Sequence, residues 1–317
     1  MAVADSTEQQ LAWEARQRPR AAVAAILAAL LMLAADLWSG AIFRDAPHSG
    51  LLEALQNAAR PGTVGTTRSG RDAFYVFYDA HLTEVIGASV VRALGLLAVG
   101  WMLTFLAAAT RSRRPQLPRA ATYLPLIGAV LQAVATLLGT VASASGVSDY
   151  LGGPRTVDAA SEVTGSSLLI ASSFIGLVGQ FALAAAFVLV CLNAMRAGLL
   201  TRFMGVLGII VGVLNVIPIG PLPVVQSFWL IALGVLFLGA WPGTGIPPAW
   251  RTGRAEPWPS QAELAEKRRA ASQARRGEPV ATPAGPAEGP PEGGSSGGDA
   301  SDGAVDGQAR RKRKRRR

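Results

Sequence analysis

Four polar side chains interrupt apolar stretches of this sequence, and their types make them its best candidates for chemistry. Asp36 and Arg92 are ionisable, whereas Gln132 and Gln180 carry amides. An ionisable side chain at membrane depth is costly and needs a partner, so it marks either a contact between helices or a path for a polar solute. These four residues are therefore the candidate intramembrane polar contacts of the chain.

A second group of polar residues has the spacing of metal ligands on a helix. His81 and Glu84 are three residues apart, so they can share one helix face, and Asp79 lies nearby. His48 is the only other histidine, and a metal site needs more ligands than this group supplies. We therefore predict the solvated start of a helix here and no metal site.

The sequence lacks the common motifs of catalysis and cofactor binding. It contains no phosphate-binding loop, no H-E-x-x-H zinc motif and no nucleophile elbow between a strand and a helix. Its single cysteine, Cys191, excludes an intramolecular disulfide and a paired-cysteine metal site. We therefore expect no cofactor and no enzyme activity; an intramembrane enzyme built on isolated residues is the weaker alternative.

Six apolar stretches, each near the length of a membrane-spanning helix, must position these side chains. A span needs about 20 apolar residues, and only 16% of the residues are charged, which is low for a soluble domain. We predict an all-α fold, a six-helix transmembrane bundle over residues 1–241. Its spans lie at about 21–40, 86–109, 121–144, 167–192, 203–219 and 223–241. Pro218, Pro221 and Pro223 leave an alternative, in which the last pair forms one broken hairpin.

Arginines mark one end of the predicted bundle. They lie before the first span and in the loops 111–120 and 193–202, namely Arg16, Arg18, Arg20, Arg111, Arg113, Arg114, Arg119, Arg196 and Arg202. The opposite loop, 145–166, has one arginine and three acidic residues. Positive charge marks the cytoplasmic side, so we expect an inner (cytoplasmic) membrane protein with both termini in the cytoplasm. The apolar run of the first span is too long for a cleaved signal peptide, so we expect a retained helix.

Matching depths in antiparallel neighbours predicts which polar residues meet. Asp36 lies about sixteen residues into the first span and Arg92 about seven to ten into the second, so we predict an ion pair between them. Gln132 and Gln180 lie near the middle of the third and fourth spans, which predicts a second contact. Hydrogen bonds that hold helices together are the simpler interpretation, and a polar permeation path is the alternative.

The fifth predicted span carries a motif for close helix packing. Gly208 and Gly212 are spaced by four, which lets another helix approach closely. Asn215 follows before Pro218 and can bond carbonyl groups that the proline frees, with Gln226 across the turn.

The long loop at 41–85 predicts structure outside the spans. Residues 50–60 have helical apolar spacing, which favours a short helix lying on the membrane. Phe74, Tyr75, Phe77 and Tyr78 form an aromatic cluster before the second span, either an interfacial belt or a lid over an external cavity.

After residue 241 the composition becomes that of a tail. Residues 242–276 are an extended segment rich in proline and tryptophan followed by a short helix, which Ser260 and Glu263 cap. Residues 277–317 cannot bury enough apolar surface to fold, so we predict a disordered cytosolic tail. Its end is basic throughout: Arg310, Arg311, Lys312, Arg313, Lys314, Arg315, Arg316 and Arg317. Removing these eight charges from the net +9 leaves +1, so the basicity belongs to the tail.

The basic end of the tail predicts contact with anionic surfaces. Anionic lipid headgroups, or the acidic residues of the chain's own segment 277–309, are the favoured partners. Nucleic acid phosphates are a less favoured partner.

Three segments resemble a known group of proteins. They are Leu51–Gly65 (LLEALQNAARPGTVG), Leu192–Leu214 (LNAMRAGLLTRFMGVLGIIVGVL) and Trp241–Trp250 (WPGTGIPPAW). The chain is similar to an uncharacterised family of multi-pass integral membrane proteins from high-GC, actinobacterial-type bacteria. The resemblance implies a topology and assigns no activity and no functional residues.

Two functions follow from these features. A structural or regulatory membrane protein, whose basic tail contacts anionic lipid or partner proteins, is the favoured hypothesis. The alternative is a small-solute transporter or channel using Gln132, Gln180, Asp36 and Arg92, which requires a polar cavity at the middle of the membrane.

Overall fold

The computed structural model describes residues 2–47, 68–217, 222–240, 246–256, 265–266 and 268–272. These residues form helices and connecting turns, with one isolated β-bridge between Arg68 and Thr156. The chain divides into two compact units, Met1–Pro259 and Ser260–Arg317. In the second unit, residues 265–266 and 268–272 are helical. The predicted tail 277–317, the capping residues Ser260 and Glu263, and the predicted helix 50–60 lie outside the described residues.

Among the described residues of the first unit, four helical segments are long and apolar enough to cross a bilayer, which indicates a membrane protein. They are α1 (Ala2–Phe43), α4 (Leu82–Arg113), α5 (Arg119–Gly152), and α6 (Val157–Gly165) with α7 (Ser167–Arg196). The first four predicted spans fall inside these segments.

The last two apolar helices are shorter than predicted. Helix α8 (Arg202–Val216) has 15 residues and α9 (Leu222–Leu238) has 17, so their lengths are about 22 and 26 Å. The hydrocarbon core of a bilayer is about 30 Å thick. Helix α8 ends early because Ile217, which precedes a proline, is extended. Gly239, with a φ of +78°, follows the end of α9. The predicted spans 203–219 and 223–241 were therefore too long.

Polar caps explain where several helices begin. The side chains of Thr156, Ser166 and Thr201 accept hydrogen bonds from the backbone N–H groups of Ala159, Leu169 and Met204. Each bond satisfies a donor that the first turn of the helix leaves free. Ser166 in this way separates α6 from α7.

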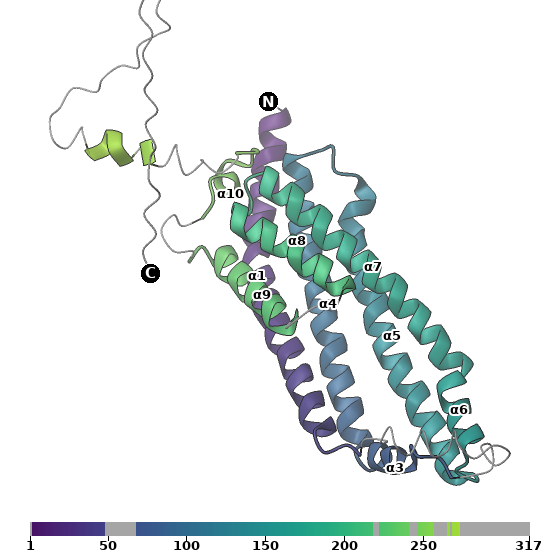
Figure 1. The fold of residues 1–317 in the computed structure, drawn as a ribbon. Coiled ribbons are helices and arrows are strands. Elements are labelled where there is room, and N and C mark those ends of the chain that lie inside the picture. The colour runs from purple at the N-terminus through teal and green to yellow at the C-terminus, as the bar shows by residue number, and fades with distance from the viewer. Residues whose placement is uncertain are drawn as a thin grey trace, which may run out of the picture. The chain divides into compact units, whose positions relative to one another are not determined.

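The helices of the first unit lie roughly lengthwise beside one another (Figure 1). Helix α9 packs against α1, and α8 packs against α7. The short helices α3 (Asp72–Ala80) and α6 lie at one end, while the start of α1 and α10 (Ala249–Thr252) lie at the other. We call the second of these the arginine-rich end, because the nine arginines named above lie in the first half of α1 or in the loops and helix ends at this side.

Two separate hydrophobic cores follow from this arrangement. The larger runs through α1, α4, α5, α7, α8 and α9 and contains Phe187, Trp229 and Phe237. The smaller lies at the α3 end and contains Tyr75, Tyr78 and Tyr150. The aromatic residues of α3, predicted to form an interfacial belt or a lid, contribute to this small core, in which Tyr75 and Tyr150 are in edge-to-face contact at 4.7 Å. Their place relative to a membrane stays a prediction.

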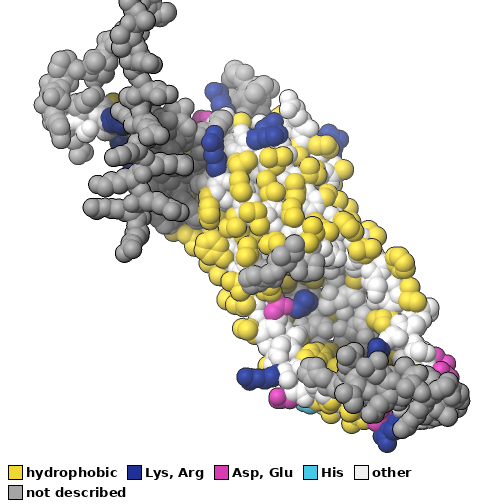
Figure 2. Space-filling view, viewed as in Figure 1, with side chains coloured by type: hydrophobic (Ala, Val, Ile, Leu, Met, Phe, Trp, Pro, Cys, Tyr) yellow, Lys and Arg dark blue, Asp and Glu magenta, His cyan; other side chains and the backbone are white. Residues whose placement is uncertain are grey.

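The outer surface of the helices is apolar along much of their length. Exposed large hydrophobic residues run along α5 from Tyr123 to Val141 and along α7 from Leu168 to Leu189. The stretch on α5 is about 27 Å long, close to the thickness of the hydrocarbon core. Figure 2 shows hydrophobic side chains gathered over the middle of one face, with basic side chains beyond them near the start of α1. This surface is suited to lipid.

Glycines allow the close helix approaches predicted for α8. A Cβ atom added to Gly208 would lie 2.4 Å from Cys191 Sγ, and one on Gly212 would lie 2.7 Å from Phe187 Cβ. Both contacts are with α7, so the prediction of close packing is confirmed and its partner identified. A second close approach, between α5 and α7 at Gly128 and Gly179, was not predicted, and there the added Cβ atoms would meet backbone atoms.

Residues 246–256, part of the segment predicted to be extended, pack against the bundle and contain the short helix α10. Trp250 is 5% exposed, and its indole Nε1 donates to the Leu199 carbonyl at 3.1 Å. Arg113, counted above as a loop charge, is buried beside it and pairs with Glu14 at 2.6 Å. Residues 246–256 therefore close the arginine-rich end of the bundle.

Candidate functional site

An ion pair joins α1 and α4 at the position predicted from depth. Arg92 Nη2 donates to Asp36 Oδ1. The side chains are 39% and 23% exposed, respectively, so the pair is not enclosed by protein. It has one positive and one negative partner and no net charge.

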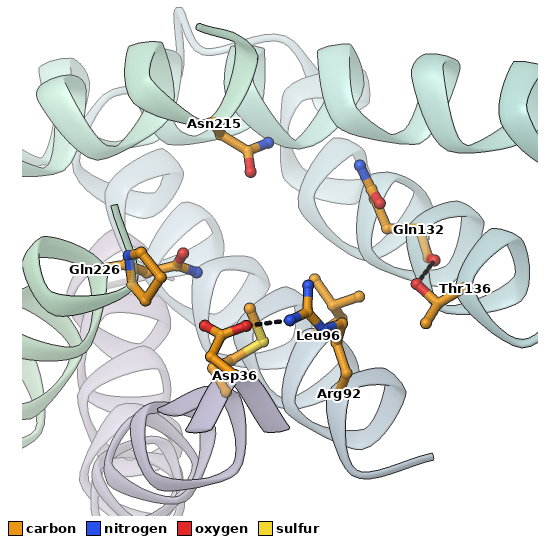
Figure 3. A pocket seen from close by; sticks show the side chains of 9 residues that line it. Asp36, Arg92, Leu96, Gln132, Thr136, Asn215 and Gln226 are labelled. Carbon is orange, nitrogen blue, oxygen red and sulfur yellow. Dashed lines mark hydrogen bonds and ion pairs between the residues drawn. The ribbon is translucent and has the colours of Figure 1, made fainter. Parts of the chain in front are cut away.

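This pair forms part of the wall of a cavity with a volume of about 180 Å³. A water molecule takes about 30 Å³ in the liquid, so the cavity has room for several waters or one small solute. Five helices supply its lining, which is Met32, Asp36, Arg92, Leu96, Gln132, Thr136, Asn215, Pro223 and Gln226. We call it the polar cavity. Figure 3 shows the labelled polar side chains arranged around this common space.

Two amides of the polar cavity have no hydrogen-bond partner within the described part of the chain, namely those of Gln132 and Gln226. The hydrogen bond drawn at Gln132 in Figure 3 involves its backbone and not its amide: the Thr136 hydroxyl donates to the Gln132 backbone carbonyl at 2.8 Å. Gln226 is only 6% exposed. Buried amides are normally paired, because an unmade hydrogen bond costs free energy. Gln132 is only partly buried, so both amides are available to bond water or a polar solute in the cavity.

Gln180 does not meet Gln132 as predicted. Its side-chain amide donates to the backbone carbonyl of Asn215, and the Asn215 side chain donates to the Gln180 carbonyl at 3.3 Å. The face of α7 that meets Gln132 carries Gly179, where an added Cβ would lie 2.8 Å from the Gln132 backbone nitrogen. The backbones therefore touch at this depth, and Gln180, one residue further along α7, faces α8 instead. The predicted Gln132–Gln180 contact was wrong in its partner.

The short hairpin of α8 and α9 supplies the side of the polar cavity that sequence reasoning missed. Asn215, Pro223 and Gln226 come from the end of the hairpin where its two helices meet. Sequence position placed Asn215 and Gln226 near one turn, but no signal placed that turn beside Asp36 and Arg92. The one available signal was the short length of these two helices. Helices of this length cannot run from the arginine-rich end to the opposite ends of α1 and α7, so the turn between them must lie partway along the bundle.

The hairpin ends at the middle of the longer helices. Asn215 bonds Gln180, which lies thirteen residues, or about 20 Å, from the start of α7 at Ser167. Exposed apolar residues continue past this depth on α7, at Leu168, Ile170 and Phe174. The end of the hairpin is therefore level with apolar surface and not with the polar end of the molecule.

The remaining candidate residues are not part of the polar cavity. His81 stacks on Phe77, with ring centroids 4.2 Å apart, and its Nδ1 lies 2.9 Å from the Phe77 carbonyl. Within the described residues, no three His, Cys, Asp or Glu side chains are grouped to hold a metal ion. The basic run 310–317 lies outside the described residues, so its partners stay a prediction.

No family model, curated protein or solved structure matches this chain. The resemblance to a family of bacterial membrane proteins therefore stays a prediction from three sequence segments. The functional argument rests on the geometry of the polar cavity.

Proposed function

We propose that this protein binds a small neutral or zwitterionic polar solute in the polar cavity and carries it across the membrane. One observation supports this most: at membrane depth, a cavity is lined by an ion pair and by amides that lack partners within the described residues. If these groups only held helices together, they would bond one another and leave no cavity. The transporter or channel hypothesis is therefore favoured over a purely structural role.

The lining indicates the class of solute. Asp36 and Arg92 cancel each other's charge, so the site does not favour an ion of either sign. Glutamine and asparagine amides offer both donors and acceptors, and the volume of about 180 Å³ limits the solute to a few heavy atoms. Glycerol, urea and alanine are neutral or zwitterionic molecules of that size.

We further propose that α8 and α9 enter the membrane from the arginine-rich end and turn back inside it. The hairpin is too short to cross, and its tip is level with apolar surface. The described start of α1 and residues 246–256 meet at one end, where Gly253 packs on Leu11. Both therefore lie on one side, and positive charge favours the cytoplasm of the cell for that side.

Cysteine labelling in intact cells tests this topology. The native Cys191 is fully buried, so it adds little background. A membrane-impermeant maleimide should label a cysteine at Asp158 in intact cells and one at Pro115 only after permeabilisation. A cysteine at Ile217, near the hairpin tip, should stay unlabelled in both conditions. Labelling of position 217 from the same side as 158 would instead support six full spans.

Uptake into vesicles tests the solute function. The full-length protein is reconstituted into liposomes, and entry of radiolabelled glycerol, urea and alanine is measured against protein-free liposomes. We expect uptake of at least one of the three, and a drop of about tenfold or more in two variants. Gln132→Leu removes an amide from the cavity wall, and Asp36→Asn removes the negative charge that balances Arg92.

The control for uptake is Asn193→Leu. Asn193 lies on α7, where its amide bonds the Leu189 carbonyl, and it does not line the polar cavity. This variant should transport as the unaltered protein does. No uptake of any probe, or equal losses in Asn193→Leu and Gln132→Leu, would refute the proposal.

The structural or regulatory role of the basic tail is a second proposal that rests on sequence alone. Eight consecutive positive charges at 310–317 favour binding to an anionic leaflet, at about 1 kcal/mol for each basic residue near the surface. The tail and the polar cavity involve different residues, so both functions are compatible. The affinity for anionic vesicles, measured for the chain with and without residues 310–317, tests the tail function separately from solute uptake. Deleting these residues should lower that affinity.

A further inference from the structure

A second cavity lies at the arginine-rich end, between the end of α4 and the start of α5. Its volume is about 560 Å³, and its lining is Ala108, Arg111, Ser112, Pro115, Arg119, Thr122 and Tyr123. We call it the basic groove. None of these residues lines the polar cavity.

The basic groove carries two positive charges that nothing in the described chain neutralises. Arg111 and Arg119 form no ion pair with a described residue. Glu14, which accepts a hydrogen bond from Ser112 in the groove wall, is already paired with Arg113 at 2.6 and 2.7 Å. The groove therefore has an unbalanced positive potential, which favours an anion.

An unsatisfied hydroxyl gives independent evidence for a polar occupant. The hydroxyl oxygen of Thr122 is buried and has no hydrogen-bond partner among the described residues. A buried hydroxyl without a partner costs free energy, so an oxygen acceptor in the groove would stabilise it. Phosphate oxygens accept hydrogen bonds from hydroxyl and guanidinium groups alike.

The surroundings of the basic groove distinguish a lipid from a soluble anion. Tyr123, in its wall, is 61% exposed and is the first of the exposed apolar or aromatic residues along α5; Leu126 and Ile127 follow. Tyrosine is typical of the membrane interface, where its hydroxyl meets headgroups. The groove therefore opens where lipid-facing surface begins, so that a phosphate could sit at the arginines while acyl chains follow α5.

We propose that the basic groove binds the phosphate headgroup of an anionic phospholipid. Arg111 and Arg119 contact the phosphate, the Thr122 hydroxyl donates to it, and Tyr123 packs at the level of the lipid glycerol. Basic pockets between spanning helices are the sites that such headgroups recognise. The site is independent of the polar cavity and of the basic tail.

Lipid titration followed by native mass spectrometry tests the proposal. Full-length protein in neutral detergent is titrated with phosphatidylglycerol or phosphatidylcholine, and bound lipids are counted. We expect preference for phosphatidylglycerol, and a loss of affinity of about thirtyfold in the Arg111→Gln/Arg119→Gln variant, from two basic contacts. Thr122→Val, which keeps all charges, should lose affinity by a smaller factor.

A charge-matched control separates the groove from general attraction. Arg196→Gln/Arg202→Gln removes two exposed arginines that lie at the same end but outside the groove, and it should leave affinity nearly unchanged. The same comparison in a chain lacking residues 310–317 measures the tail's own contribution, and the loss in the groove variant should persist there. Three outcomes would each overturn the lipid site. The first is an equal loss of lipid affinity in the two double-arginine variants, and the second is no loss of affinity when the groove variant is made in the chain lacking residues 310–317. The third is displacement of the lipid by 10 mM inorganic phosphate.

Discussion

Replacing Arg113 with methionine should destabilise the protein by about 3–5 kcal/mol, because the change leaves a buried carboxylate without its partner. Arg113 has a fully buried side chain, and Glu14 beside it is 2% exposed. The guanidinium donates to both oxygens of Glu14, at 2.6 and 2.7 Å. Methionine has a similar length but offers neither charge nor donor.

The same guanidinium attaches the segment that follows α9. Its Nε and Nη2 donate to the Ala249 carbonyl at 3.0 and 2.9 Å, and it lies 5.3 Å from the centroid of the Trp250 ring. Trp250 stacks on the ring of Phe105, and Trp13 of α1 also packs against the Phe105 ring. The Arg113→Met variant should therefore also expose residues 246–256 to proteolysis.

Thermal unfolding in detergent and limited proteolysis measure both effects. Arg114→Met is the matched control, since the neighbouring arginine makes no side-chain bond to a described residue and should change the melting temperature little. The double variant Glu14→Gln/Arg113→Met should recover part of the loss, because it removes the unpaired charge. Equal melting temperatures for the two single arginine variants would contradict the buried ion pair.

Replacing Gly128 with leucine should separate α5 from α7 and lower stability by about 3 kcal/mol, at the upper end of the usual cost of overpacking. A Cβ atom at Gly128 would lie 2.6 Å from the Leu183 backbone nitrogen and 3.0 Å from its Cα. Backbone atoms cannot rotate away as a side chain can, so the helices themselves must move. On the facing helix, a Cβ atom at Gly179 would lie 2.8 Å from the Gln132 backbone nitrogen.

The matched control is Gly40→Ala on α1. A Cβ at Gly40 would have no described atom within 4 Å apart from the neighbouring backbone of its own helix. This change should therefore be neutral or slightly stabilising, as alanine favours helix over glycine. The measurement is the melting temperature together with the fraction of monodisperse protein on gel filtration. A Gly128→Leu variant as stable as Gly40→Ala would show that α5 and α7 are not in backbone contact.

Sequence patterns could predict the parts of this protein that depend on composition and depth. Apolar length predicted the four long helical segments, because a bilayer requires about 20 apolar residues whatever their neighbours. Depth in antiparallel helices placed Asp36 beside Arg92, since helical rise converts residue number into height. The spacing of Gly208 and Gly212 predicted a close approach, although not that α7 is the partner.

Rotation about a helix axis and the packing of distant segments were decided by tertiary structure alone. Gln180 and Gln132 have matching depths, yet Gly179 faces α5 and turns Gln180 toward Asn215. Arg113 has the sequence context of a loop charge, but the return of residues 246–256 buries it against Glu14. Height along a helix follows from counting residues, whereas the direction of a side chain depends on which helix packs beside it. The polar cavity needed five helices to meet, and for that reason only the folded chain reveals it.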